Sequence, residues 1–142
     1  MALDQSFVGR SYPPTAPYLV GREKIREFAT AINDSNPAYH DLEAAHALGH
    51  PDLVAPPTFT IVVSLPAARQ VMFDPALGLD YARVVHGEQR FELRRPIHAG
   101  DELTVVATVE KIRSVAGNDI ITTRGDISTT AGEPVAIAHS TL

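Results

Sequence analysis

Apolar residues in the first third of the chain recur with the spacing of an amphipathic helix. Within residues 22–32 they stand at positions i, i+3, i+4 and i+7, which is one buried helical stripe. These positions are Ile25, Phe28, Ala29 and Ile32. The next run, 33–37, is Asn-Asp-Ser-Asn-Pro, whose turn-forming residues end the helix. A second, short helix is predicted from Asp41, which can cap it, to Leu48 before Gly49.

The segment from Thr58 to Met72 is apolar on nearly all faces. Such a segment is either a buried strand or a fully buried helix, and its length favours the helix. Pro57 falls at or just before the first turn, where a missing N–H costs little, whereas Pro66 falls inside. We therefore expect a core helix over 58–72 that is kinked or split at Pro66.

The second half of the chain alternates between apolar and polar positions in four long runs. They cover 83–95, 101–112, 120–130 and 134–142, and short Gly-containing turns at 99–101, 116–119 and 131–133 join them. Four consecutive antiparallel strands are predicted. One apolar helix beside such a sheet requires the sheet to curl around it, with one face buried and the other polar. The sequence thus predicts an α+β hot-dog fold, with an antiparallel sheet wrapped around a central apolar helix, in one domain over 1–142.

The charge balance bears on the kind of partner. The 142 residues carry 12 Lys and Arg against 17 Asp and Glu, a formal net charge of −5. Because phosphate binding needs a basic face, this balance argues against a nucleic-acid partner. A carrier of acyl thioesters would need a local basic patch, for which Arg90, Arg94 and Arg95 form the densest group. The alternative is that these three side chains solvate a strand edge.

The residue types that are missing narrow the chemistry further. The chain has no cysteine, which excludes disulfides, thiolate metal sites and a cysteine nucleophile. His and carboxylate residues do not stand at ligand spacing, so no metal site is expected. The first residues lack the apolar region of a signal peptide, and no stretch reaches the ~18 apolar residues of a membrane span. We expect a cytoplasmic protein without a membrane partner.

Several motifs resemble those of the MaoC-like hot-dog dehydratases. The run over 33–41, Asn-Asp-Ser-Asn-Pro-Ala-Tyr-His-Asp, is similar to the hydratase motif of that superfamily. The run over 54–59, Val-Ala-Pro-Pro-Thr-Phe, is similar to the start of its central helix, and 95–103 resembles its usual strand-turn-strand. The resemblance covers almost the whole chain. It implies the hot-dog fold and the binding of an acyl thioester.

In catalytic members of that family the loop reads Asp-x-Asn-Pro-x-His, and the central helix opens with Ala-His-Gly. Dehydration of a hydroxyacyl thioester removes a proton next to the carbonyl and delivers one to the leaving hydroxyl, so an Asp and a His must converge. A backbone N–H at the helix N-terminus can stabilise the charge that builds on the thioester oxygen.

This chain departs from the catalytic pattern at two positions. Tyr39 stands where the family has its His, and His40 lies one residue further on, which turns a helical side chain by roughly 100°. Pro57 stands where the family has the glycine whose N–H holds the thioester oxygen, and proline has no N–H. Losing one such donor alone costs about 10²–10³ in rate.

With these departures the chain resembles the HadA-type subunits of actinobacterial (R)-hydroxyacyl dehydratases. The helix start over 55–59 and the run over 84–91 are similar to theirs. In those systems this subunit shapes the acyl pocket while a catalytic HadB-like or MaoC-like hot-dog partner supplies the Asp and the His. The resemblance implies an acyl-carrier-protein or coenzyme A thioester as substrate, and no metal or redox cofactor.

Two sets of residues are candidates for the site. Asp34 and His40 are the candidate catalytic pair, although Asp34 is also an ordinary turn residue and His40 is also explained as a solvent-facing loop residue. The candidate substrate-binding residues are Tyr39, Pro57, Thr58, Phe59, Val63, Met72, His86 and Gln89. The alternative for the apolar members is a place in the core, and for His86 and Gln89 a structural hydrogen bond. His98 and His139 are expected to be exposed.

Three functions are compatible with these residues. The leading hypothesis is the substrate-holding subunit of an (R)-3-hydroxyacyl-thioester dehydratase, paired edge to edge with a catalytic hot-dog partner. The second is a homodimeric (R)-specific enoyl hydratase that uses Asp34 and His40 unaided. The third is a non-catalytic acyl-thioester binding module. A lone hot-dog layer leaves a sheet edge uncovered, so some dimer is expected in each case.

Overall fold

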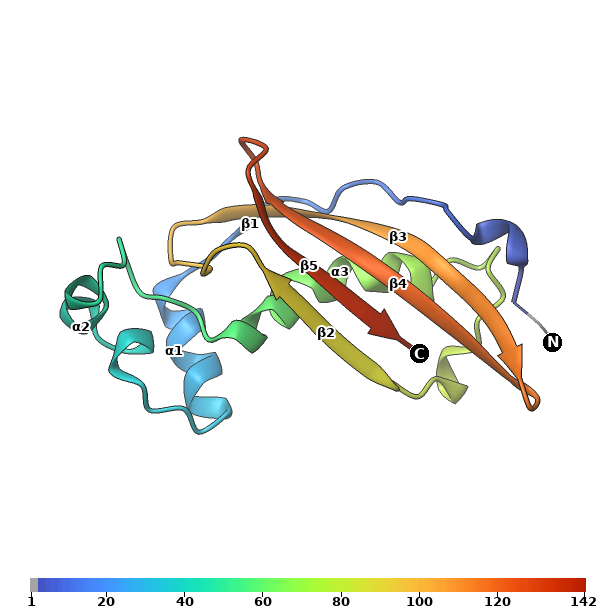
Figure 1. The fold of residues 1–142 in the computed structure, drawn as a ribbon, viewed down its shortest axis with the longest axis horizontal. Coiled ribbons are helices and arrows are strands. Elements are labelled where there is room, and N and C mark those ends of the chain that lie inside the picture. Colours follow the sequence, from blue (N-terminus) through green and yellow to red (C-terminus); the bar gives the residue numbers. More distant parts are fainter. Residues whose placement is uncertain (1–2) are drawn as a thin grey trace.

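The computed structural model describes residues 3–142, and its five strands form one antiparallel sheet. The order across the sheet is β1-β3-β4-β5-β2, so β1 and β2 are the two edges. The strands are β1 (Tyr18–Leu19), β2 (Glu88–Leu93), β3 (Glu102–Val115), β4 (Asn118–Thr129) and β5 (Pro134–Thr141). The long strands β3, β4 and β5 run side by side and curve over the central helix (Figure 1).

Within residues 3–142, three α-helices accompany the sheet: α1 (Arg22–Ala31), α2 (Leu42–Ala47) and α3 (Thr60–Met72). The central helix α3 packs against β3, β4 and β5, whereas α1 and α2 lie together at one end of the molecule (Figure 1). The described residues also form four short 3₁₀ turns, Gln5–Phe7, Pro37–Tyr39, Pro57–Phe59 and Tyr81–Arg83. One sheet curled over one apolar helix is the predicted hot-dog fold, which is confirmed.

The core lies between α3 and the inner face of the sheet. Along β3, Leu103, Val105, Ala107 and Val109 are buried while the residues between them are at least partly exposed. On the helix, Val63, Ala67 and Val71 are buried at i, i+4 and i+8. Alternate residues of the strand and every fourth residue of the helix therefore face each other, and their apolar side chains form one layer of the core.

Most predicted elements are found at their predicted places. The helix over 22–32 ends at Ala31, and the Asp41 carboxylate caps α2 by accepting a hydrogen bond from the Glu43 N–H at 3.4 Å. The core helix begins with the 3₁₀ turn at Pro57 and then continues as one α-helix from Thr60 through Pro66 to Met72. The predicted split at Pro66 was therefore wrong. The proline ring is exposed, and the packing of the buried side of α3 holds the helix together.

Two predictions about the strands need correction. The first run was expected to be extended from residue 83, but the Asp80 carboxylate accepts a hydrogen bond from the Ala82 N–H at 3.1 Å and caps a 3₁₀ turn over Tyr81–Arg83. Pairing with β5 is established only near Gly87, whose N–H donates to the Thr141 carbonyl at 2.8 Å. The sheet also has a fifth strand, since the two residues of β1 pair with Leu103 and Glu102.

Candidate functional site

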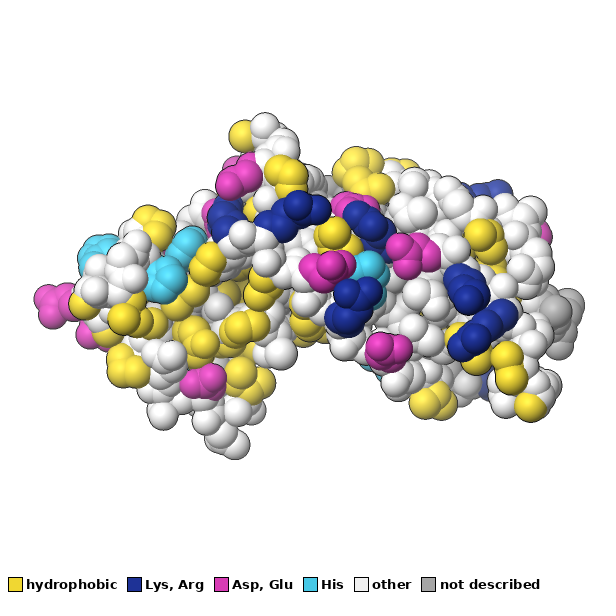
Figure 2. Space-filling view, viewed as in Figure 1, with side chains coloured by type: hydrophobic (Ala, Val, Ile, Leu, Met, Phe, Trp, Pro, Cys, Tyr) yellow, Lys and Arg dark blue, Asp and Glu magenta, His cyan; other side chains and the backbone are white. Residues whose placement is uncertain are grey.

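A cavity of about 430 Å³ lies between the loop that follows α1, the start of α3 and the end of β2. We call it the loop cavity. Hydrophobic and His side chains gather at this end of the molecule, near α1 and α2 (Figure 2). Its lining consists of Asn36, Ala38, Tyr39, Leu48, His50, Val54, Ala55, Pro56, Pro57, Thr60, Leu93, Arg94, Arg95, Pro96 and Ile97.

Local hydrogen bonds shape the loop that brings Tyr39 into this cavity. The Asn36 side-chain oxygen accepts a hydrogen bond from the Ala38 N–H at 3.1 Å and caps the 3₁₀ turn Pro37–Tyr39. Partial burial raises the pKa of Tyr39, and the negative charge of Asp34 raises it further. The Tyr39 hydroxyl is therefore a neutral hydrogen-bonding group near neutral pH.

The His40 side chain contacts the backbone of Asp34, and neither residue lines the loop cavity. The Asp34 carboxylate accepts a hydrogen bond from the Asn36 N–H at 3.0 Å, which is the ordinary turn geometry of an Asp. The His40 Nε2 lies 2.9 Å from the Asp34 carbonyl oxygen, and Arg26 Nε donates to the His40 carbonyl at 2.9 Å. Both side chains hold the loop in shape in this arrangement.

The one imidazole that lines the loop cavity, His50, belongs to a pair with His98. His50 Nδ1 and His98 Nε2 are 3.0 Å apart, so one of the two nitrogens must carry a proton and the other must accept it. The expectation that His98 is exposed was wrong, because the β2–β3 loop folds its ring against His50. His139 was also expected to be exposed, yet its side chain is only 14% exposed and its Nε2 lies 2.5 Å from Glu92.

The imidazole pair predicts a pH-dependent stability. Partial burial lowers the pKa of His98 from its ordinary 6.5, and the neighbouring His50 lowers it further. The unfolded chain then binds a proton more readily than the folded one, so this contribution to the free energy of unfolding is complete above pH 6.5 and is lost as the pH falls through the folded-state pKa. Urea unfolding from pH 7.5 to 5 should show this decline, and His98→Gln should make it shallower.

His46 provides a matched control for that measurement, because it is an exposed His in the same region whose Nε2 lies 3.2 Å from the Pro51 carbonyl oxygen. His46→Gln should keep the slope of the unmodified protein. If the free energy of unfolding depends on pH equally in the His98→Gln variant and in the unmodified protein, protonation of the imidazole pair is not linked to folding.

Of the three arginines in the predicted basic patch, two are matched by carboxylates. Arg95 lies 2.9 Å from Asp101 and 3.2 Å from Glu133, and these hydrogen bonds raise its pKa. Arg90 is 3.6 Å from Glu92. Within residues 3–142, no carboxylate lies within ion-pair distance of Arg94, which is exposed at the rim of the loop cavity. Acidic and basic side chains alternate over the same face (Figure 2).

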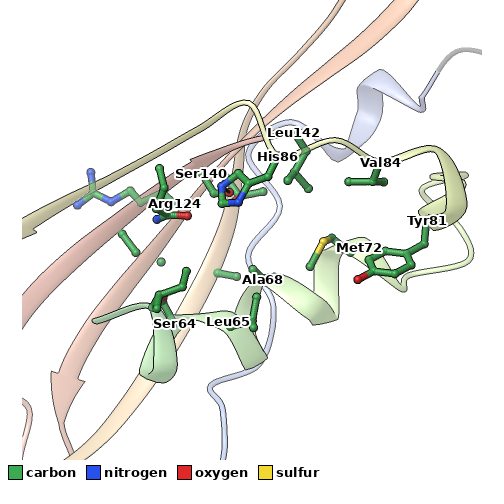
Figure 3. Close-up of a pocket in the computed structure, with 16 residues that line it drawn as sticks. Ser64, Leu65, Ala68, Met72, Tyr81, Val84, His86, Arg124, Ser140 and Leu142 are labelled. Atoms are coloured by element: carbon green, nitrogen blue, oxygen red, sulfur yellow. Dashed lines mark hydrogen bonds between the residues drawn. The ribbon is translucent and has the colours of Figure 1, made fainter. Parts of the chain in front are cut away.

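A second cavity of about 440 Å³ lies between α3 and the inner face of the sheet. We call it the inner cavity. Ser64, Leu65 and Ala68 face it from the helix, and Met72, Tyr81 and Val84 lie toward its other end (Figure 3). The full lining is Ile61, Ser64, Leu65, Ala68, Met72, Tyr81, Val84, His86, Gln89, Ala107, Thr123, Arg124, Gly125, Ala138, Ser140 and Leu142.

A row of small residues keeps this space open. Ala107, Gly125 and Ala138 are direct neighbours across β3, β4 and β5. A Cβ on Gly125 would lie 3.2 Å from Val105 Cγ1, so the strand backbone is already close to its neighbours there. The adjacent row contains the larger Val105 and Ile127. Three small residues side by side therefore leave a gap between sheet and helix that larger side chains would fill.

The predicted substrate-binding residues are divided between these cavities and the core. Tyr39 and Pro57 line the loop cavity, and Met72, His86 and Gln89 line the inner cavity. Phe59 and Val63 are core residues, and the Phe59 ring packs edge-on against Phe28 at 5.5 Å. Thr58 is exposed and lines neither cavity.

Sequence reasoning did not find several residues of the two sites. The small row of the inner cavity consists of single residues inside strands, and only the strand register brings them together. His50 of the loop cavity carried no motif signal. Over residues 3–142, no cluster of three or more His or carboxylate side chains could hold a metal ion, and no helix is long and apolar enough to cross a membrane.

Comparison with known proteins places the chain in a family. The FAS1-like dehydratase domain region matches residues 6–138. UPF0336 protein SCO4636 of Streptomyces coelicolor is 64% identical over all of this chain and 95% of its own length.

Among solved structures, a MaoC-like dehydratase is 40% identical with a TM-score of 0.88, and the match covers 96% of this chain but only 42% of that one. A chain of the C-terminally truncated HadBC complex, a (3R)-hydroxyacyl-ACP dehydratase from Mycobacterium tuberculosis, is 36% identical with a TM-score of 0.80 over 96% of both chains. The chain therefore belongs to the FAS1-like dehydratase domain region family and is homologous to the MaoC-like hot-dog dehydratases.

Proposed function

We propose that this chain is the HadA-like subunit of an (R)-3-hydroxyacyl-thioester dehydratase, which shapes the acyl pocket while a hot-dog partner supplies the catalytic Asp and His. The observation that carries the proposal is the content of the loop cavity. Tyr39 and Pro57 line it at the positions where the catalytic pattern has a His and a glycine N–H. The loop cavity therefore corresponds in position to the active site of catalytic members but lacks their acid–base pair.

The other groups of the loop cavity do not replace that pair. No Asp or Glu among the described residues lines it, and its one imidazole, His50, is held at Nδ1 by His98. Proton removal next to the carbonyl and proton delivery to the hydroxyl both need a positioned acid or base. These groups must then come from outside this chain.

The edge of β2 is the proposed docking site for the partner. β2 lies at one edge of the sheet, and its last residue, Leu93, is 39% exposed and lines the loop cavity. A partner strand that pairs with this edge would satisfy its free backbone groups and cover the cavity. The similar HadBC structure is described as a complex, which supports assembly with a second hot-dog subunit.

The two cavities suit the two parts of an acyl thioester. The loop cavity lies at the N-terminal end of α3 with Arg94 at its rim, which suits the thioester and the phosphate of its carrier. The inner cavity, between α3 and the sheet, is walled largely by apolar side chains and suits the acyl chain. The carrier is an acyl-carrier protein or coenzyme A.

The self-sufficient homodimer is the weaker alternative. It requires the Asp34 and His40 side chains to act on one substrate, but His40 contacts the Asp34 carbonyl and neither residue lines the loop cavity or the inner cavity. A non-catalytic binding module is the third possibility. It would bind thioesters yet add no turnover to any hot-dog partner.

The test is hydration of an enoyl thioester by this chain, by its catalytic partner and by both together. We expect the mixture to be at least tenfold faster than the sum of the separate rates, because a positioned acid–base group contributes about 10²–10⁴. Asp34→Asn and His40→Ala should leave the rate of the mixture within a few-fold. Strong hydration by the isolated chain that either substitution abolishes would contradict the partner assignment. If the chain binds the thioester but does not increase the hydration rate of the partner, the non-catalytic binding module is the supported function.

A further inference from the structure

The inner cavity contains polar side chains that have no protein partner. Ser64 on α3 and Thr123 on β4 are only 6% and 5% exposed. Neither hydroxyl forms a hydrogen bond with any residue in 3–142, although both residues line the cavity. In that part of the chain every fully enclosed polar side-chain atom has a hydrogen-bond partner. Because these two hydroxyls have none, they are not fully enclosed, and the space onto which they open is the cavity.

The polar groups on the sheet side form a row. Thr123, Ser140 and Gln89 are direct neighbours across β4, β5 and β2, and all three line the cavity. The Ser140 hydroxyl lies 3.3 Å from His86 Nε2. This polar row stands next to the small row of Ala107, Gly125 and Ala138 in the strand register. The gap that the small residues open is thus bordered by hydrogen-bonding groups.

Apolar side chains lie on both sides of these groups. Ile61 borders the cavity at the start of α3, and Leu65, Met72 and Leu142 border it further along. A saturated chain would fit against those walls, but it would remove water from the Ser64 and Thr123 hydroxyls and give no hydrogen bond in return. A buried hydroxyl without a hydrogen-bond partner would disfavour the binding of such a chain.

We infer that the acyl chain accepted by the inner cavity carries an oxygen function, a hydroxyl or a carbonyl, part of the way along its length. This function forms hydrogen bonds with Thr123 and Ser64, and the apolar walls enclose the methylenes on either side. The inference rests on the proposed function, because it assigns the chemical class of the tail that the subunit holds. The thioester itself stays in the loop cavity.

The experiment compares the binding of decanoyl-pantetheine with that of isomers bearing one hydroxyl at successive carbons of the distal half, by isothermal titration calorimetry. At least one isomer should bind about five- to tenfold more tightly than decanoyl-pantetheine, the value of one or two hydrogen bonds to otherwise unpartnered groups. Thr123→Val, which keeps the shape of the side chain, should reduce this preference to less than twofold. Ser64→Ala should reduce it as well, which provides a second variant on a different element.

Thr122 is the matched control, since it is the preceding residue of β4, lies on the opposite face and lines neither cavity. Thr122→Val should keep the full preference. If decanoyl-pantetheine binds as tightly as every isomer, the hydroxyls serve ordered water only, and the inference is overturned while the proposed function stands. If no pantetheine thioester binds, the proposed acyl site fails together with the inference.

Discussion

Replacement of Leu93 by Asp is expected to abolish association with the catalytic partner and the dehydratase activity that depends on it. Leu93 ends the edge strand β2 and lies at the opening of the loop cavity. In the proposed heterodimer the partner covers this side chain, so a carboxylate there would lose its hydration and replace an apolar contact between the subunits. We expect the affinity between the subunits to fall by about 100-fold or more, as measured by analytical ultracentrifugation and by the rate at limiting subunit concentration.

Leu19 offers the matched control on the opposite edge of the sheet. It belongs to β1, is 66% exposed and lines neither cavity. Leu19→Asp introduces the same charge at the same kind of strand and should leave association unchanged. If Leu93→Asp forms the complex as tightly as Leu19→Asp does, the partner does not use the β2 edge.

The fold was predictable wherever a periodic pattern extended over several turns or strand residues. The stripe of α1 and the alternation in β3 to β5 both place their apolar residues on one side, and the buried Ile25 and Ala29 lie on the predicted face. Two residues cannot show a period, so β1 could only be found through its pairing with β3. The prediction at Pro66 was wrong because helix propensity is a local quantity, whereas the buried face of α3 is stabilised by packing against β3, β4 and β5.

The loop cavity was partly predictable, because Tyr39 and Pro57 belong to contiguous motifs. The inner cavity was not, since it depends on strand register. Ala107, Gly125 and Ala138 lie far apart in the chain and become neighbours only through two antiparallel pairings. The His50–His98 contact is of the same kind, because it joins two loops. Two lining residues carried by continuous motifs were therefore predictable, whereas space created by tertiary pairing was not.

Replacement of Ala68 by Phe is expected to shorten the acyl chain that the protein can bind. Ala68 lies on α3 and faces the inner cavity, so an aromatic ring at this position would occupy the space proposed for the distal methylenes (Figure 3). Each buried methylene contributes about 0.8 kcal/mol, so exclusion of four of them should weaken decanoyl-pantetheine binding by about 200-fold. In the proposed arrangement butyryl-pantetheine is too short to reach that region, so its affinity should change by less than threefold in the same titration.

Ala131 provides the matched control, because it is exposed in the turn between β4 and β5 and lines neither cavity. Ala131→Phe should bind both thioesters as the unmodified protein does. Thermal unfolding of each variant separates a blocked cavity from a damaged fold, since overpacking costs typically 1–3 kcal/mol and would weaken both ligands alike. A loss of affinity for decanoyl-pantetheine alone would locate the acyl tail between α3 and the sheet. Unchanged decanoyl binding in folded Ala68→Phe would place the tail elsewhere, because a chain in the inner cavity could not avoid the ring.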